Sequence, residues 1–315
     1  MRIIVVGVGG VGGMVGGLLA KSGVEVGFVA RGEQLRALQE RGLRIDSARG
    51  VFTIEPVEVA EDPAQLAPAD VVLVATKAWQ VAEIAPQLLP LIEKGGFVVP
   101  LQNGVEAAPS LARALGAERV AGGFCAMLAW KEQEDPGLIK HEGAMLRVVV
   151  GERPRGVSPR VTQLVQVLSA ANMDAEVSDN IERALWEKFL FIASFGAVAA
   201  ASRSPVGVVR TQPETRALLT AAMEEIAALA RRRGVTLPEG AVARALAHVD
   251  SLLPHATASM QRDIQAGRRS ELQDQTGAVI RLAAEVGLAV PVNQFLWATL
   301  LPQELAAQAG HRTHL

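Results

Sequence analysis

The sequence predicts an α/β Rossmann-like N-terminal domain followed by an all-α C-terminal domain. Two observations lead to this prediction. Up to about Val177, short β-rich runs alternate with helical runs, which is the order of a doubly wound parallel sheet. From Asn180 onward the runs have helical periodicity and strand signals nearly vanish. We therefore expect two domains, residues 1–178 and residues 179–315.

The first predicted element is a strand at Ile3 to Val6 that runs directly into a glycine-rich helix start. In the pattern Gly7-x-Gly9-x-x-Gly12, the first glycine permits a tight turn, the second lets a pyrophosphate approach, and the third lets helix and strand pack closely. Such a pattern is weak by itself in a glycine-rich stretch. In this context it predicts that a dinucleotide's phosphates contact the loop, formed by Gly7, Val8, Gly9, Gly10, Val11 and Gly12.

A second strand, Val24 to Ala30, follows a helix at roughly Val11 to Ser22 and completes a β-α-β unit. NAD sites usually carry Asp or Glu at the end of this strand, where the acid accepts from a ribose hydroxyl. Here the residue is Arg31, whose guanidinium suits a 2′-phosphate, so the sequence favours NADP (NADPH) over NAD. The alternative is a solvated arginine that opens the next helix.

The remaining elements follow from changes in periodicity. Residues 43–59 contain short strands around the turn Ser47-Ala48-Arg49-Gly50, which indicates a hairpin insertion. Further strands are expected at Val71 to Ala75, Phe97 to Val99, Arg119 to Met127 and Leu146 to Val150. Helices are expected at residues 180–201, 212–233, 239–251, 259–266, 271–286 and 293–308.

Composition indicates a soluble cytoplasmic enzyme. Thirty-one basic and thirty-three acidic residues give a net charge of −2, so we expect no nucleic-acid and no membrane partner. The single cysteine, Cys125, fits a reducing compartment and lies in an apolar run that predicts a small buried residue. The apolar run Phe189 to Ala201 is too short to span a bilayer and reads as a buried helix. We expect no metal site and a frayed tail at 310–315.

Two polar groups follow predicted strands at the edge where a cofactor would bind. Asn103-Gly104 comes just after the strand Phe97 to Val99, and its amide is placed to contact cofactor or substrate. Lys77 follows the strand Val71 to Ala75, where its ammonium could reach ribose or phosphate. The ordinary readings are a turn for Asn103 and a surface lysine for Lys77.

Lys188 lies on the apolar face of its predicted helix. Helical spacing places it on one stripe with Ile181, Leu185, Ile192, Phe195 and Ala199. Partial desolvation lowers the pKa of a lysine and makes it a better proton donor to a carbonyl oxygen that receives hydride. The alternative is a lysine whose stem packs while its head reaches water.

Ser259 and Glu271 are the last candidates. A serine hydroxyl can bind a carboxylate, and a glutamate can accept from a substrate hydroxyl. Each also has an ordinary reading, because Ser259 can simply start a helix and Glu271 can favour a first helical turn through the macrodipole.

Together and in this order, these motifs resemble the ketopantoate reductase family over nearly the whole chain. The resemblance rests on Gly7-x-Gly9-x-x-Gly12 with Arg31, Asn103-Gly104, Asn180-Ile181-x4-Trp186-x-Lys188 and Ser259-Met260-x-x-Asp263-x3-Gly267-Arg268-x-x-Glu271. It implies a helical domain of the 6-phosphogluconate dehydrogenase C-terminal type. It also implies NADPH-dependent reduction of 2-dehydropantoate (ketopantoate) to (R)-pantoate, a step of pantothenate biosynthesis in the coenzyme A pathway.

The resemblance also implies residue roles. Lys188 would be the general acid at the keto oxygen, and Glu271 would hold the substrate hydroxyl and lie against the cofactor. Ser259 would bind the substrate carboxylate, and Asn103 would orient substrate and nicotinamide. A homodimer is our expectation for the assembly.

Three departures from the family pattern bear on the substrate. The family often has asparagine at the positions of Ile192, Gly196 and Thr276. Because isoleucine neither donates nor accepts a hydrogen bond, polar substrate contacts are missing, each worth about 1.5–3 kcal/mol when a charged group takes part. A family member that reduces a different, more apolar 2-keto acid is therefore one alternative. A non-catalytic NADP-binding sensor is another, although it would need neither Lys188 nor Glu271.

Overall fold

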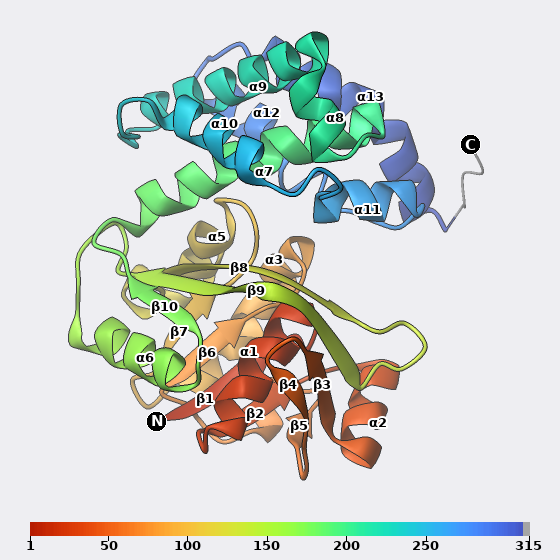
Figure 1. Ribbon diagram of the computed structural model, residues 1–315. Helices are drawn as coiled ribbons and strands as arrows, with labels where there is room; N and C mark the ends of the chain where they lie inside the picture. Colours follow the sequence, from red (N-terminus) through yellow and green to blue (C-terminus); the bar gives the residue numbers. More distant parts are fainter. Residues whose placement is uncertain (311–315) are drawn as a thin grey trace. The chain divides into compact units, whose positions relative to one another are not determined.

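The computed structural model describes residues 1–310, so the expectation for the tail falls largely outside the described residues. The chain divides into two compact units (Figure 1). An α/β unit contains Met1–Gln102 and Ala107–Glu182, and a helical unit contains Asn103–Glu106 together with the chain from Arg183 onward. An α/β Rossmann-like domain followed by a helical domain is the predicted fold class, which is confirmed.

The centre of the α/β unit is a five-stranded parallel sheet in the order β5-β2-β1-β6-β7. Its strands are rich in β-branched residues and largely buried on both faces, as expected for parallel strands covered by helices. The strands are β1 (Arg2–Val6), β2 (Glu25–Val29), β5 (Glu58–Ala60), β6 (Val71–Val74) and β7 (Phe97–Pro100). The expected runs at 3–6, 24–30, 71–75 and 97–99 are therefore strands.

A second sheet, with the order β10-β9-β3-β4 and β8 paired to β9, was not predicted. The hairpin was expected, and it is β3 (Leu43–Ser47) with β4 (Gly50–Ile54). The long antiparallel pair of this sheet is β8 (Gly122–Lys131) and β9 (Leu138–Gly151). Both strands were expected with other starting points: β8 starts after Arg119, which belongs to a 3-10 turn, and β9 starts before Leu146. The first half of β9 mixes buried Ile139 and His141 with exposed Glu142, Gly143 and Ala144, so it lacks a continuous hydrophobic signal. The last strand is β10 (Asp174–Val177).

Helix α1 (Gly10–Lys21) packs against both sheets, which explains its extra glycines. A Cβ atom on Gly16 would lie 2.4 Å from the Phe28 ring of the parallel sheet. A Cβ atom on Gly13 would lie 2.5 Å from Ile139 of the second sheet. Since real side chains do not approach so closely, these glycines outside the phosphate-loop pattern are required for packing.

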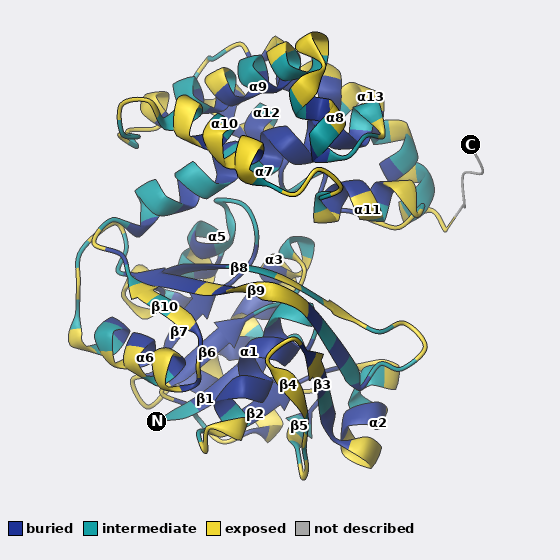
Figure 2. Ribbon diagram, in the orientation of Figure 1, coloured by how far each residue is buried: buried dark blue, intermediate teal, exposed yellow. Residues whose placement is uncertain are grey.

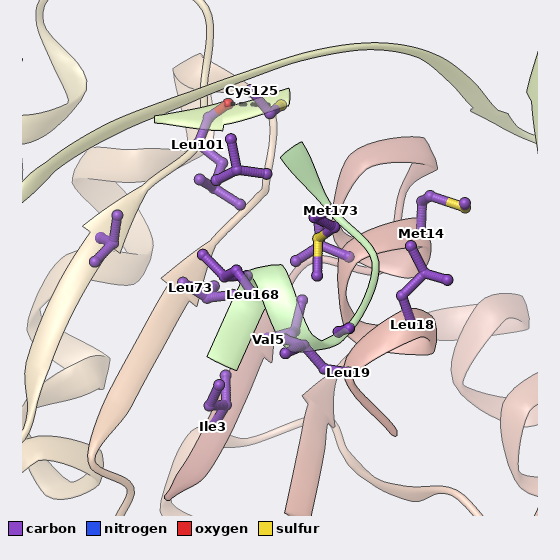
Figure 3. Close-up of a cluster of buried hydrophobic side chains, with 14 of the residues drawn as sticks. Ile3, Val5, Met14, Leu18, Leu19, Leu73, Leu101, Cys125, Leu168 and Met173 are labelled. Atoms are coloured by element: carbon purple, nitrogen blue, oxygen red, sulfur yellow. Dashed lines mark hydrogen bonds between the residues drawn. The ribbon is translucent and has the colours of Figure 1, made fainter. Parts of the chain in front are cut away.

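The main core of this unit lies around α1 and includes Met14, Leu19, Leu73 and Met173 (Figure 3). Cys125 is buried there, and its thiol donates to the Leu101 carbonyl at 3.7 Å, so the prediction of a small buried residue is confirmed. The other helices are α2 (Gly32–Arg41), α3 (Val81–Ile84), α4 (Leu89–Ile92), α5 (Ala107–Leu115) and α6 (Pro159–Ala170), with 3-10 turns η1 (Pro63–Gln65), η2 (Ala78–Gln80), η3 (Ala85–Leu88) and η4 (Ala117–Arg119).

The helical unit is built around α7 (Ile181–Ser202). By length and composition α7 could cross a membrane, but 67% of its most apolar window is buried, which is typical of a core helix (Figure 2). The others are α8 (Val206–Thr211), α9 (Pro213–Arg232), α10 (Ala241–Ser251), α11 (Ser259–Gln265), α12 (Thr276–Glu285) and α13 (Pro291–Gln308). The short helix α8 was not predicted, and the predicted helix at 271–286 begins too early.

The division between the units falls within the first turn of α7. Ile181 still packs on the α/β unit, because Cβ atoms built on Gly122 or Gly151 would lie 2.8 Å from its side chain. The loop Asn103–Glu106 groups with the helical unit, and Glu106 pairs with Arg281 of α12 at 2.7 Å. The helical unit therefore contains a four-residue loop from an early part of the chain.

Candidate active site

Three predicted site residues of the helical unit form one hydrogen-bonded chain. Lys188 Nζ donates to Asn103 Oδ1 at 2.9 Å, and Asn103 Nδ2 donates to Glu271 Oε2 at 3.1 Å. Glu271 is 8% exposed, and Lys188 and Asn103 are half-buried. The fold thus brings together a cation, an amide and a carboxylate that are far apart in sequence.

The chemistry of the end groups fixes the orientation of the Asn103 amide. An ammonium can only donate and an ionised carboxylate can only accept, so the amide oxygen faces Lys188 and its nitrogen faces Glu271. The Lys188 ammonium, on the apolar face of α7, therefore donates a hydrogen bond to the Asn103 side chain. Gly104, with φ +101°, supplies the turn that presents Asn103.

Lys188 is the only lysine in the chain after Lys140. Apart from the histidines, all other basic residues of the helical unit are arginines. Arginine does not give up its proton in proteins, whereas a lysine can do so when its surroundings lower its pKa. Lys188, which donates to Asn103 from α7, is therefore a cationic residue that can serve as a proton donor.

Glu271 lies in a turn before α12, so its expected place in a first helical turn is wrong. The backbone N–H groups of Asp274 and Gln275 donate to the Glu271 carbonyl at 3.1 and 2.9 Å and close this turn. The preceding residue is held by a buried carboxylate, because Ser270 donates through N and Oγ to Glu304 Oε2 at 3.0 and 2.6 Å. Helix α13 thus fixes the backbone that presents Glu271.

Ser259 is exposed and is the first residue of α11. None of the hydrogen bonds found among residues 1–310 joins it to the Lys188–Asn103–Glu271 chain. Its two neighbours do face α7, because a Cβ atom on Gly196 would lie 3.1 Å from Met260 Cε and 3.8 Å from Ala258 Cβ. Its role in binding a carboxylate therefore stays a prediction.

The glycine loop of the α/β unit has a shape that suits a pyrophosphate. Gly7 has φ +94°, and a Cβ atom there would lie 2.7 Å from the Thr76 nitrogen. A Cβ atom on Gly12 would lie 2.0 Å from the Gly7 carbonyl oxygen. A Cβ atom on Gly9, by contrast, would meet nothing within 4 Å, so the space above the helix N-terminus is open.

Arg31 and Lys77 lie at the same edge of the parallel sheet, because Val29 and Val74 both pair with Val6. Lys77 is exposed, and its Nζ lies 5.6 Å from the centroid of the Trp79 ring. Arg31 pairs with Glu83 at 3.3 Å, with both side chains about half exposed or more (48% and 67%). Exposed pairs of this kind are weak, so the guanidinium is accessible to a stronger anion.

The comparisons with known proteins agree over most of the chain. Residues 3–155 match the model of ketopantoate reductase PanE/ApbA, and residues 180–304 match its C-terminal model. A 2-dehydropantoate 2-reductase of Halobacterium salinarum is 31% identical and is matched over 94% of this chain and 96% of its own. The chain belongs to the ketopantoate reductase family.

Other relatives extend this picture of the ketopantoate reductase family. The crystal structure of a PanE/ApbA family ketopantoate reductase from Ralstonia eutropha superposes with a TM-score of 0.88 at 30% identity, covering 98% of this chain and 100% of that one. An uncharacterized oxidoreductase of Bacillus subtilis is 29% identical over 95% of this chain and 98% of its own. High similarity within the family is therefore not confined to proteins of known substrate.

Two residues of this ketopantoate reductase site were not predicted from the sequence. Gln275 donates through Nε2 to Glu271 Oε2 at 3.2 Å, and Glu304 anchors Ser270 from α13. Gln275 lies in a turn and Glu304 near the end of a long helix, and neither position has a local signature of a site. Among residues 1–310, the structure has no group of three or more His, Cys, Asp or Glu residues that could hold a metal ion.

The carboxyl group of Asp274, next to Gln275, is harder to ionise in the folded protein than in water. Burial, and then the negative charge of Glu271, raise the pKa of Asp274 from 3.8 to about 6. Its Oδ2 is buried without a hydrogen-bond partner among the described residues. Because the pKa of this carboxyl is higher in the folded than in the unfolded protein, its ionisation favours unfolding. The protein therefore loses stability as pH rises through about 6.

We therefore expect Asp274→Asn to stabilise the protein only at neutral and alkaline pH. After discounting for partial exposure, the gain in unfolding free energy should be on the order of 1 kcal/mol at about pH 8, and near zero at about pH 4. Thermal melts of wild type and variant at both pH values measure this. A gain of equal size at both values would contradict the assignment.

Proposed function

We propose that the protein catalyses NADPH-dependent reduction of 2-dehydropantoate to (R)-pantoate, a step of pantothenate biosynthesis. The observation that carries the proposal is the chain in which the Asn103 amide joins Lys188 to Glu271. The relatives of similar sequence that bear the name 2-dehydropantoate 2-reductase support the choice of substrate.

Each residue of the chain has a definite task in this proposal. Lys188 Nζ–H donates the proton to the keto oxygen as that oxygen gains negative charge. Glu271 accepts a hydrogen bond from the substrate hydroxyl, and Asn103 holds both groups at a fixed separation. Ser259 is proposed to bind the substrate carboxylate from the start of α11.

The cofactor proposal rests on the α/β unit. NADPH, when bound, supplies the hydride. The open space over Gly9 fits a pyrophosphate on the helix N-terminus, and Gly7, Val8, Gly10, Val11 and Gly12 complete the loop that would hold it. Arg31 would bind the 2′-phosphate, and Lys77 lies at the same sheet edge to contact ribose or phosphate.

A second candidate is reduction of a more apolar 2-keto acid. One and two turns beyond Lys188, α7 presents half-buried Ile192 and buried Gly196, so this side of the helix offers no polar side chain. Such a surface would favour a substrate whose chain is an alkyl group.

The test is the rate of NADPH oxidation by the purified protein with ketopantoate, beside a panel of other 2-keto acids and NADH controls. Saturable turnover of ketopantoate at the highest kcat/KM of the panel is the expected result. Turnover only of an alkyl keto acid would favour the second candidate. Binding of NADPH without turnover of any keto acid would favour a sensor and overturn the enzymatic proposal.

A further inference from the structure

Glu271 is held at one carboxylate oxygen by two amides. Asn103 Nδ2 and Gln275 Nε2 both donate to Oε2, at 3.1 and 3.2 Å. Within residues 1–310, no hydrogen bond ends on the other oxygen, Oε1. Charge-assisted hydrogen bonds of this kind fix the rotation of a carboxylate, so Oε1 is kept as an acceptor in a defined direction.

The orientation of the Gln275 amide follows from the same contact. Its nitrogen must face the carboxylate, so its oxygen faces the other way, toward α7. That oxygen lies 3.6 Å from the position of a Cβ atom on Gly196. Gln275 is 2% exposed, so a side chain larger than a methyl at position 196 would compete with it for space.

We propose that Gln275 is a positioning residue for Glu271 and sets the preference for a hydroxylated 2-keto acid. Gly196 leaves the room that the Gln275 amide needs. The inference rests on the proposed function, in which Glu271 accepts from the substrate hydroxyl. An acceptor that is buried and charged discriminates strongly, because a substrate without the hydroxyl leaves it unpaired.

The first experiment compares Gln275→Met with wild type on two substrates, ketopantoate and its analogue with hydrogen in place of the hydroxyl. We expect kcat/KM for ketopantoate to fall about tenfold and kcat/KM for the analogue to change less than about twofold, since only the hydroxyl contact depends on Glu271. Gln273→Met is the matched control, because Gln273 lies in the same turn and does not donate to Glu271. It should leave the ratio of the two values unchanged.

The second experiment uses Gln275→Glu, whose neutral carboxyl can donate to Glu271 and whose carboxylate cannot. The charged groups nearest to it are Glu271 and Asp274. Lys188 is linked to Glu271 by the Asn103 amide, and Arg269, Arg281 and Glu106 act on Asp274. We expect the preference of this variant for ketopantoate over the analogue to approach the wild-type value at about pH 5 and to fall about tenfold by about pH 8. Gln275→Met should show no such recovery at low pH.

Gly196→Val provides a test from helix α7, because valine adds bulk beside the Gln275 amide without adding a polar group. It should lower the preference for the hydroxylated substrate, and its effect should not add to that of Gln275→Met, because both act on the same amide. Additive effects would overturn the coupling of Gly196 to Glu271 through Gln275.

The outcomes separate the inference from the proposed function. Wild type that reduces neither keto acid overturns both. Wild type that prefers ketopantoate, with Gln275→Met losing activity equally on both substrates, overturns the inference alone and shows a structural role for Gln275. Melting temperatures of the variants identify a loss that comes from unfolding.

Discussion

Replacing Lys188 by alanine should lower kcat for keto-acid reduction by about a thousandfold, the middle of the range for a lost general acid. The loss should appear in kcat with little change in the dissociation constant of NADPH, because Lys188 is not among the proposed cofactor contacts. Stopped-flow turnover and NADPH fluorescence titration measure the two quantities separately.

Lys188→Arg is the matched control for charge. An arginine keeps the positive charge but cannot release a proton, so it should recover little of the lost rate. Recovery of most of the activity in Lys188→Arg would mean that the positive charge, not proton donation, is what the site requires. Weaker NADPH binding in Lys188→Ala would show a role in cofactor binding that we do not propose.

Replacing Arg31 by aspartate should raise the dissociation constant of NADPH by about a hundredfold and change that of NADH by only a few-fold. A charge-assisted contact to the 2′-phosphate is worth about 1.5–3 kcal/mol, and an aspartate adds repulsion. Binding measured by calorimetry with both cofactors tests this directly. Equal losses for both cofactors would rule out the 2′-phosphate contact.

Glu83→Gln is the companion variant, because Glu83 pairs with Arg31 in the structure. Removing this carboxylate frees the guanidinium, so NADPH should bind as well as before or up to about fivefold more tightly, given that exposed pairs are worth at most about 1 kcal/mol. NADPH binding weakened by Glu83→Gln would mean that Glu83 itself contacts the cofactor.

The sequence was most informative where local periodicity and neighbouring elements agree. Parallel strands end at a common edge, so the places of Gly7, Arg31 and Lys77 followed from β-α-β order. The apolar stripe of α7 marked Lys188 because a lysine among Leu185 and Ile192 breaks the pattern.

Features that depend on long-range pairing escaped the sequence. The support of Ser270 by Glu304 joins residues 34 positions apart, and no local signal marks it. The second sheet was missed because the first half of β9 mixes buried residues with exposed Glu142, Gly143 and Ala144, so pairing with β8 defines it better than hydrophobicity does.

The loop Asn103–Glu106 constrains how this protein can be recombined with its relatives. A chimaera joined at Glu182 takes Lys188 and Glu271 from one parent and residue 103 from the other. If the second parent lacks an asparagine there, Lys188 and Glu271 lose the amide that joins them, although both residues come from the same parent. A successful exchange of the C-terminal half must therefore carry these four loop residues with it.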